Sequence, residues 1–198
     1  FNLAKINQQY NKALTYIDKC IALSEPNSLA AVEYGVKKVE VLTLAYERSS
    51  DKKYLEMAIA DYESLLEKMP NNISVLNNLA YMLAENDQRL SEALAYAKRA
   101  VELQPNDASI LDTYAYVLYK NGKYDEALEN LTAALQQYEQ GNGVGPSELY
   151  EHFGMVKEKL GEKAEALAYF KQSLEIGGDI LPDATKERIN RAIKRLSQ

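Results

Sequence analysis

The sequence contains only one histidine and one cysteine among its 198 residues. Zinc sites in proteins draw on several His and Cys side chains, so this composition excludes a site of that kind. A single cysteine also excludes an intramolecular disulfide bond. No apolar run approaches the roughly 20 residues that a membrane-spanning helix needs. The net charge of −6 argues against a nucleic-acid-binding role for the whole chain.

Glycine and proline are also scarce, with nine and five residues respectively. Both residue types weaken or interrupt helices, and the five prolines all lie at expected turns. The chain is 46% hydrophobic, which is enough to build a core, and 26% charged, as in an ordinary soluble protein. The composition therefore favours an ordered, all-helical protein.

A short pattern recurs along the chain. The tripeptide LAY occupies positions 44–46 and 79–81, and the related YAY occupies 114–116, so the spacing is 35 residues both times. A fourth copy of the pattern arrives later, because EQGNGVGP at 139–146 lengthens the connection before it. Apolar residues within each unit follow helical spacing, and polar turns divide each unit into two helices. Small residues recur in phase in both helices: Ala45, Ala80, Ala115 and Gly154 in the first, and Ala58, Ala93, Ala127 and Ala166 in the second.

This arrangement resembles the tetratricopeptide repeat (TPR) family, in which the small residues let the two helices of a hairpin cross closely. The resemblance implies an all-α fold, a right-handed superhelical α-solenoid of TPR helical hairpins with a C-terminal capping helix. We expect a single solenoid domain over residues 1–198. Its expected parts are a partial repeat at 1–27, repeats at 38–71, 73–106, 108–139 and 147–180, a linker at 140–146, and the capping helix at 181–198.

The N-terminal and C-terminal segments of the sequence allow further predictions. Residues 10–23 match the second helix of a repeat, and the chain does not begin with Met, so we interpret it as a fragment of a longer, bacterial-type repeat protein. The capping helix has basic residues at 186, 188, 191, 194 and 195, opposite an apolar face. A basic helix can bind nucleic acid or an anionic membrane. Because Asp183 and Glu187 lie among these cations, we interpret them as a solvated outer face.

The resemblance also implies a binding surface, because the first helices of TPR hairpins line a concave groove. Carried onto this chain, the groove residues are Leu42, Tyr46, Asn77, Tyr81, Asp112, Tyr116, Tyr119, Glu148, Glu151 and Met155. Tyrosines are good interface anchors, although they can instead pack between neighbouring repeats. An aromatic, partly acidic groove suits a protein or peptide partner with basic residues and apolar anchors.

The sequence thus predicts a non-catalytic protein-interaction scaffold. The alternatives are a self-assembling scaffold that forms homo-oligomers through its repeat ends, and a TPR adaptor of a bacterial envelope or secretion assembly. We expect no enzymatic activity, because no paired catalytic constellation is present and the lone His152 fits a structural role. No cofactor, metal or nucleic acid is expected, and the compartment stays open between cytoplasm and periplasm.

Overall fold

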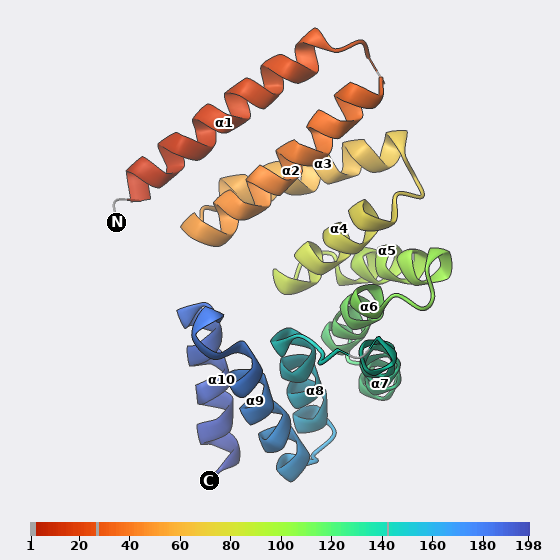
Figure 1. Ribbon diagram of the computed structural model, residues 1–198, viewed down its shortest axis with the longest axis vertical. Coiled ribbons are helices and arrows are strands. Elements are labelled where there is room, and N and C mark those ends of the chain that lie inside the picture. The colour runs from red at the N-terminus through yellow and green to blue at the C-terminus, as the bar shows by residue number, and fades with distance from the viewer. Residues whose placement is uncertain (1–2, 27, 142) are drawn as a thin grey trace. The chain divides into compact units, whose positions relative to one another are not determined.

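The computed structural model describes residues 3–26, 28–141 and 143–198, and all regular structure in these residues is helical (Figure 1). The expected all-α class is confirmed. In chain order the elements are α1 (Leu3–Leu23), α2 (Leu29–Ser49), α3 (Lys52–Lys68), α4 (Ile73–Glu85), α5 (Leu90–Leu103), α6 (Ala108–Lys120), α7 (Tyr124–Gln140), α8 (Ser147–Lys159), α9 (Lys163–Gly177), the short 3₁₀ helix η1 (Gly178–Ile180) and α10 (Asp183–Leu196).

The chain divides into two compact units, Phe1–Leu79 and Ala80–Gln198, and the boundary lies within α4. In the first unit α2 packs against both α1 and α3. Ala45 of α2 and Ala58 of α3 are completely buried, as expected of small residues at a close helix crossing. Lys38 of α2 adds a polar link among the three helices, because its Nζ lies 3.1 Å from Asp18 of α1 and 3.0 Å from Asp61 of α3.

The second unit is built from helical hairpins, in which α6 packs on α7 and α8 packs on α9. The small residues that recur in phase along the sequence are again completely buried, among them Ala93, Ala115, Ala127 and Ala166. Gly154 of α8 shows why size matters, because a Cβ atom at this position would lie 2.8 Å from two ring atoms of Phe170 of α9. The α8–α9 crossing therefore depends on the absence of a side chain at position 154.

Local chemistry sets the helix ends. Asp107 caps α6, and its carboxylate accepts hydrogen bonds from the backbone N–H groups of Ser109 at 2.9 Å and Ile110 at 3.0 Å. Gly122 ends the α6–α7 turn with φ 77°, in the left-handed region that glycine adopts most readily. Asn121 just before it donates a side-chain hydrogen bond of 3.1 Å to the carbonyl of Leu90, which ties this turn to α5.

The last helix, α10, packs on α9. Its buried residues Ile189 and Ala192 join Phe170 and Ala166 of α9 in one apolar cluster. The connection between the two helices is short and contains Gly178, whose φ of 49° again favours glycine. This placement brings Arg188 and Arg195 of α10 close to acidic residues of α4 and α8.

Candidate functional site

The ten residues predicted to line a groove fall in both units. Leu42, Tyr46 and Asn77 belong to the first unit, where Leu42 is completely buried in the core and the other two are half-buried. The other seven belong to the second unit: Tyr81 of α4, Asp112, Tyr116 and Tyr119 of α6, and Glu148, Glu151 and Met155 of α8. The site described below is built from these seven and their neighbours in the second unit.

Tyr116 lies at the centre of a cluster of rings. Its ring centroid is 5.4 Å from that of Tyr81, 6.2 Å from that of Tyr119 and 4.5 Å from that of His152. Burial, together with the nearby Glu85 carboxylate, raises the pKa of both Tyr81 and Tyr116 above the ordinary value, so both hydroxyls stay neutral. Only 4% of Tyr116 is exposed. Its ring therefore packs between helices, which is the alternative role that the sequence left open for the tyrosines.

His152 and Asp112 form a second buried contact at this site. The His152 Nδ1 atom lies 2.7 Å from Asp112 Oδ1, and both side chains are mostly enclosed. Burial alone would lower the pKa of His152, but the carboxylates of Asp112, Glu151 and Glu148 outweigh it and raise the pKa above the ordinary value. This pair joins α6 to α8, which fits the structural role expected for the lone histidine.

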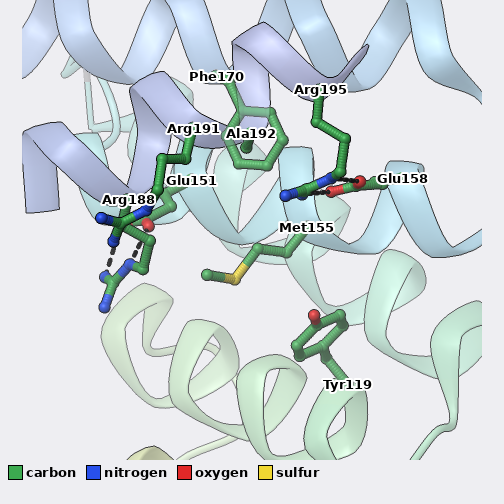
Figure 2. A pocket seen from close by; sticks show the side chains of 9 residues that line it. All are labelled: Tyr119, Glu151, Met155, Glu158, Phe170, Arg188, Arg191, Ala192 and Arg195. Atoms are coloured by element: carbon green, nitrogen blue, oxygen red, sulfur yellow. Dashed lines mark hydrogen bonds and ion pairs between the residues drawn. The ribbon is translucent and has the colours of Figure 1, made fainter.

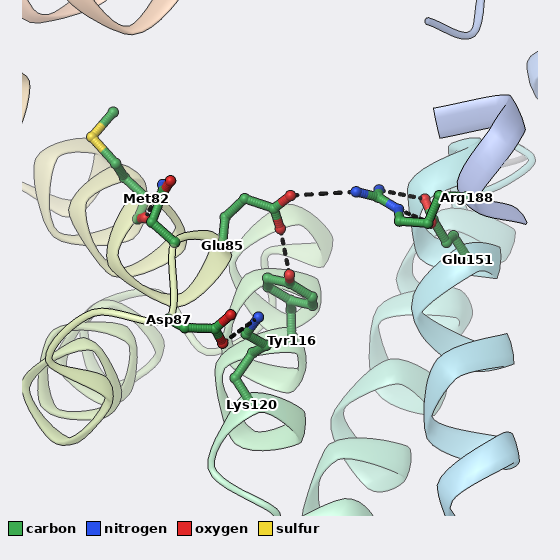
Figure 3. Close-up of polar contacts among 8 residues, drawn as sticks. Met82, Glu85, Asp87, Tyr116, Lys120, Glu151 and Arg188 are labelled. Atoms are coloured by element: carbon green, nitrogen blue, oxygen red, sulfur yellow. Dashed lines mark hydrogen bonds and ion pairs between the residues drawn. The ribbon is translucent and has the colours of Figure 1, made fainter. Parts of the chain in front are cut away.

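Arginines of α10 reach the acidic residues of the site. Arg188 forms a bidentate ion pair with Glu151, with Nε 2.7 Å and Nη2 3.1 Å from the two carboxylate oxygens. Its Nη1 lies 3.4 Å from Glu85, whose other oxygen accepts a hydrogen bond from the Tyr116 hydroxyl (Figure 3). The hydrogen bonds from Arg188 to Glu151 raise the pKa of the arginine, so the guanidinium stays charged.

Arg195 repeats this contact two turns along α10. Its Nε and Nη2 atoms each lie 2.8 Å from an oxygen of Glu158 on α8. The sequence analysis interpreted the basic residues of α10 as a solvated outer face. Arg188 and Arg195 are largely exposed, as that interpretation expects, but both side chains also pair with carboxylates of α8. Sequence reasoning also left Glu85 and both arginines out of the site. One sequence feature could have indicated the arginines: Glu151 and Glu158 on α8 have the same seven-residue spacing as Arg188 and Arg195 on α10.

A cavity of about 220 Å³ lies between α6, α8, α9 and α10 (Figure 2). Tyr119 and Met155 form one side of it, and the two Arg–Glu pairs flank it. The complete lining is Tyr119, Glu151, Met155, Glu158, Phe170, Arg188, Arg191, Ala192 and Arg195. We call this space the α8–α10 cavity.

Two family models, both described as tetratricopeptide repeat, match residues 55–108 and 106–177. The chain is a tetratricopeptide repeat protein. Members of this family are in general interaction scaffolds rather than enzymes. No curated protein sequence matches the chain.

Solved TPR structures have the same fold. PilW, described as a widely conserved type IV pilus biogenesis factor, matches with a TM-score of 0.67 and 18% identity over 95% of this chain and 80% of its own. A thermophilic TPR protein of Thermus thermophilus, TTC0263, matches with a TM-score of 0.59 and 20% identity over 97% of both chains. YrrB, described as a TPR protein with an unusual peptide-binding site, matches with a TM-score of 0.56 and 21% identity over 96% of this chain and 87% of its own.

Two further observations concern the residues that the structure describes. None of their helices combines the length and the apolar character that crossing a membrane requires. No three His, Cys, Asp or Glu side chains among them converge in a way that would hold a metal ion.

Proposed function

We propose that this TPR protein is a non-catalytic scaffold that binds a segment of a partner protein at the α8–α10 cavity. The observation that carries the proposal is the combination of side chains around this space. Tyr119 and Met155 are half-buried and offer apolar contact area, and the Arg188–Glu151 and Arg195–Glu158 pairs place polar groups beside them. Interface anchors are typically side chains of this kind, set in a partly enclosed pocket with polar groups at its edge.

The size of the cavity favours a protein partner over a small-molecule substrate. Pockets for small molecules usually measure about 300–1,000 Å³. The α8–α10 cavity, at about 220 Å³, holds one or two side chains. A partner segment would therefore place an apolar anchor beside Met155 and Tyr119 and leave the rest of its chain on the surrounding surface. Both carboxylates pair with arginines of α10, so they favour basic residues of a partner where that partner displaces α10.

Site-specific crosslinking tests this function. A photo-reactive residue placed at position 155 should capture a partner in native extract, whereas the same residue at position 136, exposed on α7, should not capture that partner. The captured protein is then purified and its affinity measured by calorimetry. We expect Met155→Ala to weaken binding at least tenfold and the control Gln136→Ala to leave it unchanged, with circular dichroism confirming that both variants fold.

Two results would reject the proposal. The first is capture of the same proteins with equal yield from positions 155 and 136. The second is an unchanged affinity of the folded Met155→Ala variant for the purified partner. Either result would move the binding surface away from the α8–α10 cavity.

A further inference from the structure

The geometry points to α10 as an internal ligand: we propose that it occupies the partner site, and that the partner is a basic amphipathic helix that competes with it. This inference rests on the binding function proposed for the α8–α10 cavity. It adds the chemical class of the partner and a regulatory role for the last helix of the chain.

The contacts of α10 are repeated in register along α8. Glu151 and Glu158 are seven residues apart on α8, and Arg188 and Arg195 are seven residues apart on α10. Seven residues make about two turns of helix, so side chains with this spacing lie on one face about 10.5 Å apart. Because 151 pairs with 188 and 158 pairs with 195, the two helices run in the same direction. The result is a ladder of two bidentate ion pairs that any helix with correctly spaced arginines can form.

Apolar and polar contacts both dock α10. Of its 14 residues, Ile189 and Ala192 are buried, and Ile193 and Leu196 are partly buried against the same apolar cluster. Arg188 and Arg195 keep 44% and 60% of their side-chain surface exposed. Exposed ion pairs contribute little to stability and are screened by salt. Helix α10 is therefore held by apolar burial together with polar contacts, and a competitor has to supply the same pattern of both.

The pattern on α10 defines the competitor. Its contact face has arginines at positions i and i+7 and apolar residues at i+1 and i+4, which are Arg188, Arg195, Ile189 and Ala192. Without α10, three carboxylates lose their arginine contacts: those of Glu85, Glu151 and Glu158. A partner helix with two cations at this spacing and a small apolar pair between them would restore the ion pairs and cover Phe170 again.

The test uses the full-length chain and one defined probe, a fluorescein-labelled peptide with the sequence of residues 182–198. Its binding is followed by fluorescence anisotropy at low salt. We expect the Arg188→Ala/Arg195→Ala chain to bind the peptide at least tenfold more tightly than the wild-type chain, because the internal competitor is weakened. The matched control, Lys194→Ala, removes a charge from the exposed side of α10 and should bind as the wild type does.

Hydrogen exchange of residues 183–196 serves as an independent readout and should become faster in the double variant, as α10 undocks. A peptide in which both arginines are replaced by alanine should not bind. Unchanged exchange in the double variant would refute the claim that the two arginines hold α10.

The remaining outcomes distinguish a failure of competition by α10 from a failure of the proposed binding function. Equal, tight binding of the peptide by wild type and double variant would refute competition by α10 and leave the proposed function standing. Faster exchange without peptide binding would refute the basic-helix partner, and the crosslinking test would still decide whether the cavity binds a different one. Dimers of the wild-type chain at micromolar concentration that are lost in the double variant would show that the occupant is α10 of a second copy, against a separate partner.

Discussion

The two Arg–Glu pairs on α8 provide a sharp prediction, because they share a geometry and differ in burial. The side chain of Glu151 is 2% exposed and that of Glu158 is 25% exposed. Truncation of Arg188 leaves a buried carboxylate without its cation, and we expect this to cost about 1–3 kcal/mol. That figure is below the roughly 3–5 kcal/mol of a fully buried pair, because Arg188 itself is close to half exposed. Truncation of Arg195 should cost about 0.2–1 kcal/mol, as for a surface pair.

Double-mutant cycles at the two pairs measure this difference directly. The stability of a repeat array is approximately a sum of repeat and interface contributions, so the free energy of this interface should be read locally from native-state hydrogen exchange of α8 and α10. The four variants of each cycle replace the arginine, the glutamate, both or neither by alanine. The account predicts a larger coupling energy for Arg188–Glu151 than for Arg195–Glu158. Equal coupling energies, or the reverse order, would refute the argument from burial.

Two further predictions concern the packing of α8. The raised pKa of His152 means that its contact with Asp112 stabilises the fold fully below the unfolded-state pKa of about 6.5, and that this stability is lost as pH rises through the folded-state pKa. The difference in melting temperature between wild type and His152→Gln should therefore be larger at pH 5.5 than at pH 9, and a difference independent of pH would contradict this. Gly154→Ala should lower stability by up to about 2 kcal/mol, because overpacking against Phe170 exceeds the gain of about 1 kcal/mol in helix propensity. Adding Phe170→Leu to Gly154→Ala should restore stability. If Gly154→Ala alone melts at a higher temperature than the wild type, the crossing has room for a Cβ atom.

The repeat pattern predicted much of the fold, since hydrophobic spacing and small residues act locally. Helix starts are also set locally: Ser28 is the N-cap of α2, and its side chain accepts a hydrogen bond from the backbone N–H of Ala31. The sequence also placed Ala45 and Ala58 at a helix crossing, where both are completely buried. Such positions follow from small residues that recur in phase and from the resemblance to the TPR family, and a larger residue there would overpack the crossing.

The site was harder to predict, because its contacts join distant parts of the chain. Arg188 and Glu85 are 103 residues apart in sequence, and His152 and Asp112 are 40 residues apart. A helical stripe indicates which face a residue occupies, but not which other helix covers that face. This is why Tyr116 was predicted in a groove, while the structure encloses it among Tyr81, Tyr119 and His152. Of the groove residues predicted for the first unit, Leu42 is completely buried and so does not line an open surface, whereas Tyr46 and Asn77 stay a prediction.

The most direct test of the central claim is the affinity of the 182–198 peptide for the Arg188→Ala/Arg195→Ala chain, measured with and without Glu158→Gln. Glu158 is partly exposed, so its neutralisation should leave the fold intact. If carboxylates of α8 recognise a basic helix, binding should saturate in the first variant and weaken at least fivefold in the second. An affinity that stays the same after Glu158 is neutralised would contradict the claim that this cavity selects a basic helical segment.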